Sequence, residues 1–301
     1  LSPGLSAAGK IPVFVSIVPQ KYFVEKIGGD LVDVRVMVEP GASPHTCEPK
    51  PGQMAALSKT RLYFATGVTF EKAWLKRISA ANPDMKVVHT DRGIEKRPMA
   101  AHHHHEGAEP GHRQGHDHHK EKGHVHDEKQ AHAHHHHEHD GLDPHVWLSP
   151  PLVKIQARNI LDALQEADPA NRHIYRDNYR GFVSGIDRLD AELRVMFAGK
   201  EGFRFMVFHP AWGYFADAYG LEQIPIEIEG KDPKPAQLKN LIENARTEGI
   251  NVIFVQPQFS AKSARVVASE INGQVVFTDP LAEDWTGNML AVAEKFRSAL
   301  K

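Results

Sequence analysis

The stretch ANRHIYRDNYRGFVSGIDRLDAELRVMF, residues 170–197, has helical and no strand character. Its apolar residues approximate one stripe at helical spacing, which predicts an amphipathic helix with these positions in the core: Ile174, Phe182, Val183, Ile186, Leu189 and Leu193. At a rise of 1.5 Å per residue, such a helix would be about 40 Å long. We expect it to run beside both halves of the chain as a long, rigid connecting helix.

Strand-like and helix-like segments alternate on both sides of this helix. Short β-branched runs predict strands at 13–18, 32–38, 62–65 and 85–89, and again at 205–208, 223–228, 252–255 and 275–278. Helical patterns lie between and beside them, at 20–28, 51–58, 70–81, 150–166, 212–219, 235–248, 261–271 and 287–300. Such alternation predicts an α/β fold with a mainly parallel sheet flanked by helices in each half.

Length and charge indicate a two-lobed protein without a nucleic-acid or membrane surface. The chain has 301 residues and a formal net charge of −2, and a typical domain has only about 100 to 150 residues. We expect an N-terminal lobe at 1–169, the connecting helix at 170–198 and a C-terminal lobe at 199–301. Lys and Arg are spread along the chain, and no apolar run approaches the roughly 20 residues that cross a bilayer.

Sixteen of the twenty-one histidines lie between His102 and His139. Imidazole is a common ligand for metal ions and is largely neutral at pH 7, so the segment indicates metal binding without choosing zinc over nickel, cobalt or copper. Residues 101–141 have almost no aliphatic or aromatic side chains, which predicts a disordered loop. An inserted purification tag is the alternative, but the run is internal and interrupted.

The same segment has a charge balance that favours cations. Between Ala101 and Gly141 there are eight Asp and Glu residues and four Lys and Arg residues. We hypothesise that the loop captures zinc weakly at several sites and raises its concentration near a tighter site. A solvated spacer is the simpler alternative, because charge-rich loops are often no more than that.

The N-terminal residues and the single cysteine bear on the cellular compartment. The chain begins without Met and has small residues before its first predicted strand, which fits an exported protein whose signal peptide is absent from this chain, or a trimmed one. Cys47 is the single cysteine, so no intramolecular disulfide can form. Cys47 also lies beyond the first predicted strand, where it cannot carry an N-terminal lipid.

Four separated residues share a position at the end of a strand or the start of a helix: His45, His145, His209 and Asp279. Open α/β sheets place ligands at such positions. The remaining histidines, His89 and His173, are interpreted as structural or surface residues. Successive candidates are 64 to 100 residues apart, which excludes a zinc finger or an HExxH helix, whose ligands are local.

Three imidazoles and one carboxylate complete a four-coordinate shell, with two ligands from each lobe. A closed shell favours binding over catalysis, because no position remains for an activated water. A zinc-dependent hydrolase is the alternative of another class, although no HExxH-like base is present; a metal-buffering or adhesion protein would use the loop alone. The acidic segment 227–232 is interpreted as an exposed turn in preference to the rim of a cleft.

Four motifs together resemble the metal-receptor proteins of ABC transporters, and most closely the periplasmic zinc receptors with a His-rich loop. The motifs are PGASPHTCEP (40–49), DPHVWL (143–148), FHPAW (208–212) and TDPL (278–281). The resemblance covers residues 11–300 in matching order. It implies two α/β lobes bridged by one long helix, with the metal between them, and a monomer that docks on a membrane permease in the periplasm.

The resemblance also implies the metal ligands His45, His145, His209 and Asp279. Some zinc receptors have a Glu directly before the first His, but Pro44 stands there in this chain, so Asp279 is expected to supply the carboxylate. Three nitrogens and one oxygen suit tetrahedral zinc, whereas manganese prefers more oxygen ligands. Zn²⁺ is therefore the expected ligand, and a manganese receptor of the same family remains the alternative.

Overall fold

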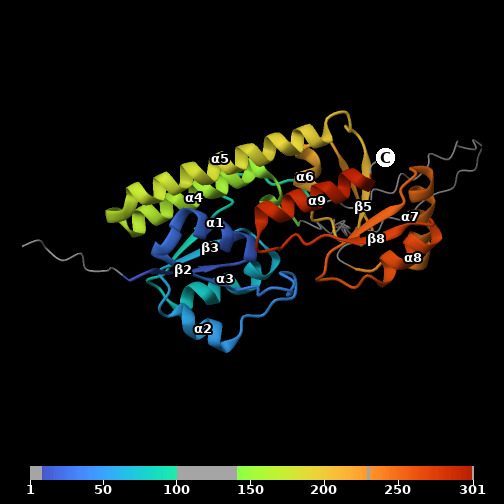
Figure 1. Cartoon of the computed structure of the whole chain (residues 1–301). Helices are drawn as coiled ribbons and strands as arrows, with labels where there is room; N and C mark the ends of the chain where they lie inside the picture. Colours follow the sequence, from blue (N-terminus) through green and yellow to red (C-terminus); the bar gives the residue numbers. More distant parts are fainter. Residues whose placement is uncertain (1–8, 100–140, 229–230, 300–301) are drawn as a thin grey trace, which may run out of the picture.

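The computed structural model describes residues 9–99, 141–228 and 231–299, and it contains two four-stranded parallel sheets. One sheet lies beside each half of a long helix, α5 (Arg172–Phe197), which runs past both of them (Figure 1). Its 26 residues correspond to about 39 Å at 1.5 Å per residue. The predicted fold class, two α/β lobes joined by one long helix, is confirmed. The predicted His-rich loop lies outside the described residues, apart from Gly141.

The N-terminal sheet has the strand order β2-β1-β3-β4. It consists of β1 (Ile11–Val15), β2 (Val32–Val36), β3 (Leu62–Ala65) and β4 (Lys86–His89). On one face, α1 (Val18–Gly28) and α4 (Pro150–Ala167) pack between the sheet and α5. On the other lie α2 (Pro51–Leu57) and α3 (Thr69–Ala81), as Figure 1 shows. Helices on both faces explain why β3 is buried along its whole length.

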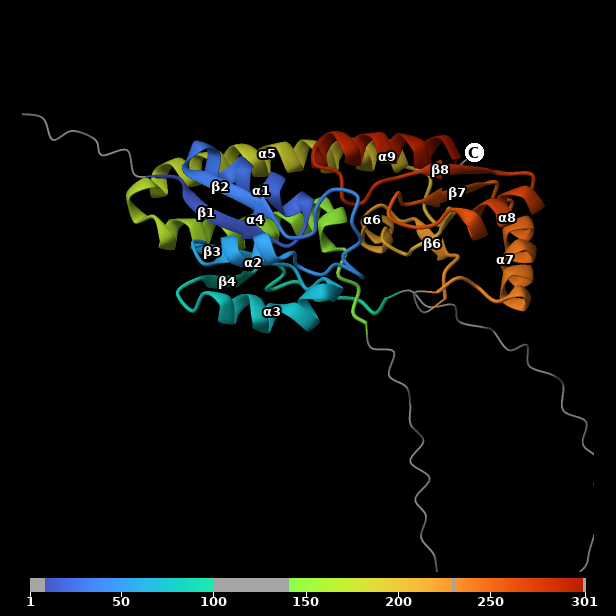
Figure 2. The same cartoon turned by 90° about the horizontal axis from the view of Figure 1, so that it is seen from below.

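The C-terminal sheet repeats this order as β6-β5-β7-β8. Its elements are β5 (Arg204–Val207), α6 (Gly213–Ala218), β6 (Glu222–Pro225), α7 (Pro235–Thr247), β7 (Val252–Val255), α8 (Lys262–Glu270), β8 (Gln274–Phe277) and α9 (Trp285–Ala299). Side chains alternate between two cores, as period-2 strands require. Phe205 and Val207 join the core shared with α5, whereas Met206 and Phe208 pack under α7 and α8. Figure 2 shows α7 and α8 at the end of the molecule away from the N-terminal lobe.

The two lobes share one continuous hydrophobic core. Helix α9 packs along α5 and reaches back to α1, where the Trp285 ring lies edge-on to Phe23 at 5.2 Å between centroids. Tyr22 and Phe182 extend the same aromatic cluster. The connecting helix therefore lies in a packed interface and does not act as an isolated linker.

Two positions in the predicted apolar stripe of α5 lie outside the core: Ile174, and Val183, which is only partly buried and belongs to neither hydrophobic cluster. Ile174 is exposed, and Tyr175 is the buried residue of the first turn. The reason is helical geometry: Tyr175 lies seven residues before Phe182 and shares its face, whereas Ile174 is rotated away from it. The Tyr175 hydroxyl also donates a hydrogen bond to Asp168 (2.8 Å), which fixes the start of the helix. Among the described residues, no helix is both long and apolar enough to cross a membrane.

Candidate metal site

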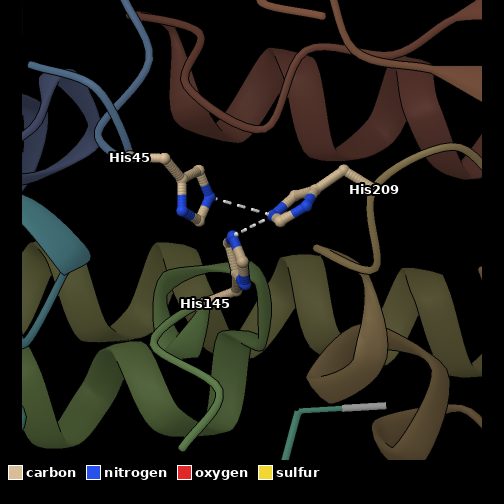
Figure 3. A group of neighbouring side chains, drawn as sticks. All are labelled: His45, His145 and His209. Atoms are coloured by element: carbon tan, nitrogen blue, oxygen red, sulfur yellow. Dashed lines mark hydrogen bonds between the residues drawn. The ribbon is translucent and has the colours of Figure 1, made fainter. Parts of the chain in front are cut away.

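Three histidines from distant parts of the chain converge between the lobes: His45, His145 and His209 (Figure 3). The Nε2 atom of His209 lies 3.2 Å from Nε2 of His45 and 3.4 Å from Nε2 of His145. One ligand nitrogen from each residue can be chosen so that all three lie within 4.8 Å of one another. Three nitrogens bound to one tetrahedral zinc at about 2.1 Å would be about 3.4 Å apart. The spacing therefore fits a single small cation.

His209 is held at the carboxyl end of β5 from several sides. Its backbone N–H donates to Gln256 Oε1 (3.2 Å) and its carbonyl accepts from Gln256 Nε2 (2.6 Å). Its ring Nδ1 lies 2.6 Å from a carboxylate oxygen of Glu227, which follows β6. Phe259, in the loop after β7, stacks on the ring at 4.8 Å. Only 4 % of His209 is exposed.

His145 precedes the short 3₁₀ turn Val146–Leu148, which leads into α4. Asp143 accepts two hydrogen bonds from it through Oδ1, from the backbone N–H (3.0 Å) and from ring Nδ1 (2.7 Å). Asp143 is itself held by the C-terminal lobe, because the Tyr214 hydroxyl donates to its carbonyl (3.0 Å). The same hydroxyl accepts the backbone N–H of Arg97 (3.0 Å).

His45 lies in the loop between β2 and α2 and is less enclosed than the other two. Its ring Nδ1 faces a neutral partner, the Thr69 hydroxyl, at 3.1 Å. Thr69 begins α3, and the next residue donates its backbone N–H to the Pro44 carbonyl (3.1 Å), which ties the loop to the helix. The position of His45 thus depends on the carboxyl ends of β2 and β3.

The hydrogen bonds at Nδ1 determine which ring nitrogen is available. An ionised carboxylate only accepts hydrogen bonds, so His145 and His209 each carry their proton on Nδ1 and leave the Nε2 lone pair free. A histidine ligand whose other nitrogen donates to a carboxylate is the usual arrangement around protein-bound metals, since it fixes the ring and raises its basicity. The two buried imidazoles are therefore oriented for a cation.

The surroundings also favour the neutral form of the His45 and His145 imidazoles. Burial, together with His209 and His145, lowers the pKa of His45 to about 3. Burial also lowers the pKa of His145, against the opposing effect of Asp143. Neutral imidazole is the form that binds metals, so no proton has to leave these two rings at pH 7.

A small, partly open cavity lies among the three histidines. Its volume is about 10 Å³, which on the same measure is about what one water molecule needs. The histidines share its wall with apolar side chains and one amide; the lining residues are Pro44, His45, His145, Trp147, His209, Gln258, Phe259, Pro280 and Leu281. A space of this size accommodates one ion and excludes an organic substrate.

The fourth predicted ligand, Asp279, lies outside the three-histidine group. It follows β8, as predicted, but its Oδ1 accepts hydrogen bonds from Gln258 Nε2 (2.8 Å) and from the backbone N–H of Leu281 (2.9 Å). Its direct ligation of a metal stays a prediction. His89 and His173 are exposed and distant from the group, in accordance with the prediction for them.

Several supporting residues were not predicted as part of the site. Glu227 belongs to the segment interpreted as an exposed acidic turn; this is wrong for Glu227, which is 7 % exposed and contacts His209. Its position at the end of the predicted strand 223–228 was a usable signal, because neighbouring parallel strands end at one edge. Thr69, Gln256 and Gln258 gave no comparable signal, since polar residues are common in loops.

Comparisons with known proteins agree with this geometry. The family model described as "ZnuA: Zinc-uptake complex component A periplasmic" matches residues 13–299. The "High-affinity zinc uptake system protein ZnuA" of Bacillus subtilis (strain 168) is 30% identical over 273 residues, which cover 89% of this chain and 78% of that protein.

Solved structures extend the likeness to the whole fold. One described as "Crystal structure of ZnuA" has a TM-score of 0.82 and 40% identity, covering 97% of this chain and 100% of that one. A ZnuA deletion mutant with zinc bound has a TM-score of 0.81 and 40% identity, covering 97% of this chain and 98% of that one. The chain therefore belongs to the ZnuA family of zinc-binding receptors of metal ABC transporters, which are not enzymes.

Proposed function

We propose that this protein binds Zn²⁺ between its two lobes, through His45, His145 and His209, and delivers it as a monomer to the membrane permease of an ABC uptake transporter. The observation that carries the proposal is the convergence of three Nε2 atoms, two of them on buried rings held by carboxylates. Family membership supports a periplasmic or extracellular location and a permease partner.

The donor set supports zinc over manganese. Three neutral imidazole nitrogens suit zinc, whereas manganese favours oxygen donors and a higher coordination number. Among the described residues, no carboxylate belongs to the group of converging side chains. The carboxylates Asp143 and Glu227 contact the imidazoles, and through them stabilise the charge of a bound ion.

Competitive titration tests the proposal. The full chain is titrated with Zn²⁺ and Mn²⁺ against chelators of known affinity, and bound metal is counted by elemental analysis. We expect one tight zinc equivalent, a much weaker affinity for manganese, and loss of the tight equivalent in H209A. H209Q serves as the matched variant, because its amide still donates a hydrogen bond to buried Glu227. An H209A protein that keeps its tight zinc would overturn the site.

We further propose that the His-rich segment collects zinc for this site. The structure suggests where to cut, because Met99 N–H donates to the Gly141 carbonyl (3.0 Å) and Pro98 bridges Leu142, so a short turn can join Met99 to Gly141. The deletion should lower metal stoichiometry and spare one tight equivalent. A second variant replaces the sixteen histidines by Gln and keeps the length of the segment. If the imidazoles capture zinc, this variant should bind less metal, whereas a segment that is only a spacer would work as before.

A further inference from the structure

Among the described residues, the three histidines share the lining of the small central cavity with one amide side chain, Gln258. It lies in the loop after β7, next to Phe259, which stacks on His209. Its carbonyl oxygen, Oε1, is buried and has no hydrogen-bond partner among the described residues. A buried carbonyl without a partner is unusual in native proteins, and an ion or a water molecule is a common explanation.

The orientation of this amide follows from its other contact. Gln258 Nε2 donates a hydrogen bond to Asp279 Oδ1 at 2.8 Å. Asp279 is a carboxylate and can only accept, so the nitrogen of the amide must face Asp279 and the oxygen must face the other way. The unpartnered atom is therefore an acceptor with free lone pairs.

Asp279 itself is held in place by the surrounding backbone. Its Oδ1 also accepts the N–H of Leu281 (2.9 Å), and its carbonyl accepts from Asn288 Nδ2 (2.7 Å). The next carbonyl, of Pro280, accepts from Trp147 Nε1 (2.8 Å). These contacts hold Oδ1 of the carboxylate against the Gln258 amide, and Asp279 lies outside the three-histidine group.

The same construction thus occurs three times around the cavity. Asp143 holds His145, Glu227 holds His209 and Asp279 holds Gln258, each through a hydrogen bond of 2.6 to 2.8 Å from the side chain. In the two histidine pairs, the atom left free is the one that faces the cavity. By the same geometry, the free atom of Gln258 is Oε1.

We propose that Gln258 Oε1 supplies the fourth ligand of the bound zinc, and that Asp279 is a positioning residue that orients and polarises the Gln258 amide. This inference rests on the proposed function, because it concerns the same ion. The inner shell then consists of three imidazole nitrogens and one amide oxygen, all neutral. Asp143, Glu227 and Asp279 each form a hydrogen bond with one ligand residue and do not bind the ion themselves.

Zinc affinity in a double-mutant cycle tests this assignment. We expect D279A to bind zinc about 10- to 100-fold more weakly, the range found for residues that hold a metal ligand in place, and Q258A to lose more than D279A. In the double variant, D279A should add nothing, since it acts through Gln258. A larger loss in D279A than in Q258A would make Asp279 the ligand, and an unchanged affinity in Q258A would also overturn the proposal.

Q156A is the matched control. Gln156 is a fully buried glutamine of α4 whose amide also has no partner, but it does not line the cavity. Urea unfolding of the metal-free variants reports how far each substitution destabilises the fold. Suppose that Q258A loses zinc affinity while Q156A, which is destabilised at least as much, keeps it. The loss in Q258A then arises at the metal site and not from a less stable fold.

Cobalt substitution gives a readout that a merely structural role would not change. Removing the amide oxygen admits water to the fourth position, and metal-bound water can ionise near neutral pH. The visible spectrum of the Co²⁺ form should therefore depend on pH near neutrality in Q258A and not in the unmodified protein. A pH-dependent spectrum in the unmodified protein would show that water holds this position and overturn the proposal. An H209A protein that keeps its tight zinc would contradict the proposed function. If H209A loses its tight zinc but Q258A binds zinc with unchanged affinity, only this inference fails.

Discussion

The two lobes are built on the same strand order, yet they hold their histidines differently. In the C-terminal lobe, His209 lies two residues after β5, the Gln256 amide bonds to both its N–H and its carbonyl, and its ring contacts the buried carboxylate of Glu227. In the N-terminal lobe, His45 lies in a loop, is only partly buried and contacts the neutral Thr69 hydroxyl. We infer that His209 is the fixed anchor of the site and His45 its adjustable member.

The largest expected effect separates these two histidines directly. A structural zinc site of four ligands contributes about 10 to 16 kcal/mol, or about 3 kcal/mol per ligand, so H209A should weaken zinc binding by at least about 100-fold. H45A should lose clearly less, because its ring is less fixed before the ion arrives. Chelator competition measures both, and equal losses would remove the distinction between the lobes.

The next largest effect concerns the hydrogen-bond partners of the His209 and His45 rings. E227Q keeps the shape of the side chain but removes the charge behind His209, and it should weaken zinc binding by about 10-fold or more. T69V removes only a neutral hydrogen bond of about 0.5 to 1.5 kcal/mol, and should cost less than about 10-fold. Isothermal titration against a competing chelator compares them. A T69V effect as large as that of E227Q would contradict the comparison.

A pH dependence should appear in the metal-free protein. The pKa of His45 is about 3 in the fold against an ordinary 6.5, so below pH 6.5 the unfolded chain binds a proton that the folded chain does not. The free energy of unfolding should therefore fall as the pH falls from 6.5 toward 3, by up to about 1.4 kcal/mol per pH unit for this residue. Urea unfolding with chelator present, from pH 7 to 5, should show a shallower slope in H45Q; identical slopes would refute the lowered pKa.

The smallest expected effect lies at the contact between Asp143 and the C-terminal lobe. Y214F removes a hydroxyl that bonds to Arg97 N–H and to the Asp143 carbonyl, so it should lower the free energy of unfolding by about 1 kcal/mol per lost bond. Zinc affinity should change only a few-fold, since Asp143 keeps both bonds to His145. A loss as large as that of E227Q would show that the support of His145 depends on the C-terminal lobe.

Most of the fold could be predicted from the sequence, because the periodic pattern of apolar residues in a long segment indicates whether it forms a helix or a strand. The predicted strands and helices are all present, with ends displaced by a few residues; α1, for example, begins at Val18, where Pro19 suits the first turn of a helix. The wrong core position at the start of α5 arose because two adjacent apolar candidates, Ile174 and Tyr175, fit a loosely drawn stripe.

The site could be predicted only in part. The three histidines could be singled out because each stands at a strand end or helix start and sixteen of the other eighteen histidines lie in one segment. Their partners could not be, since a pair such as His209 and Glu227 is joined only when two strands become neighbours in the sheet. The hydrogen bond that turns Asp279 toward Gln258 depends in the same way on the folded loops after β7 and β8.

Trp147 gives the protein a built-in optical probe. Its indole is fully buried, lies 5.1 Å from the His145 ring between centroids, and donates a hydrogen bond to Pro280 of the opposite lobe. A cation bound to His145 changes the charge beside this ring, and a movement between the lobes changes its hydrogen bond. Its fluorescence should therefore report metal arrival and lobe separation in the unlabelled protein, in real time.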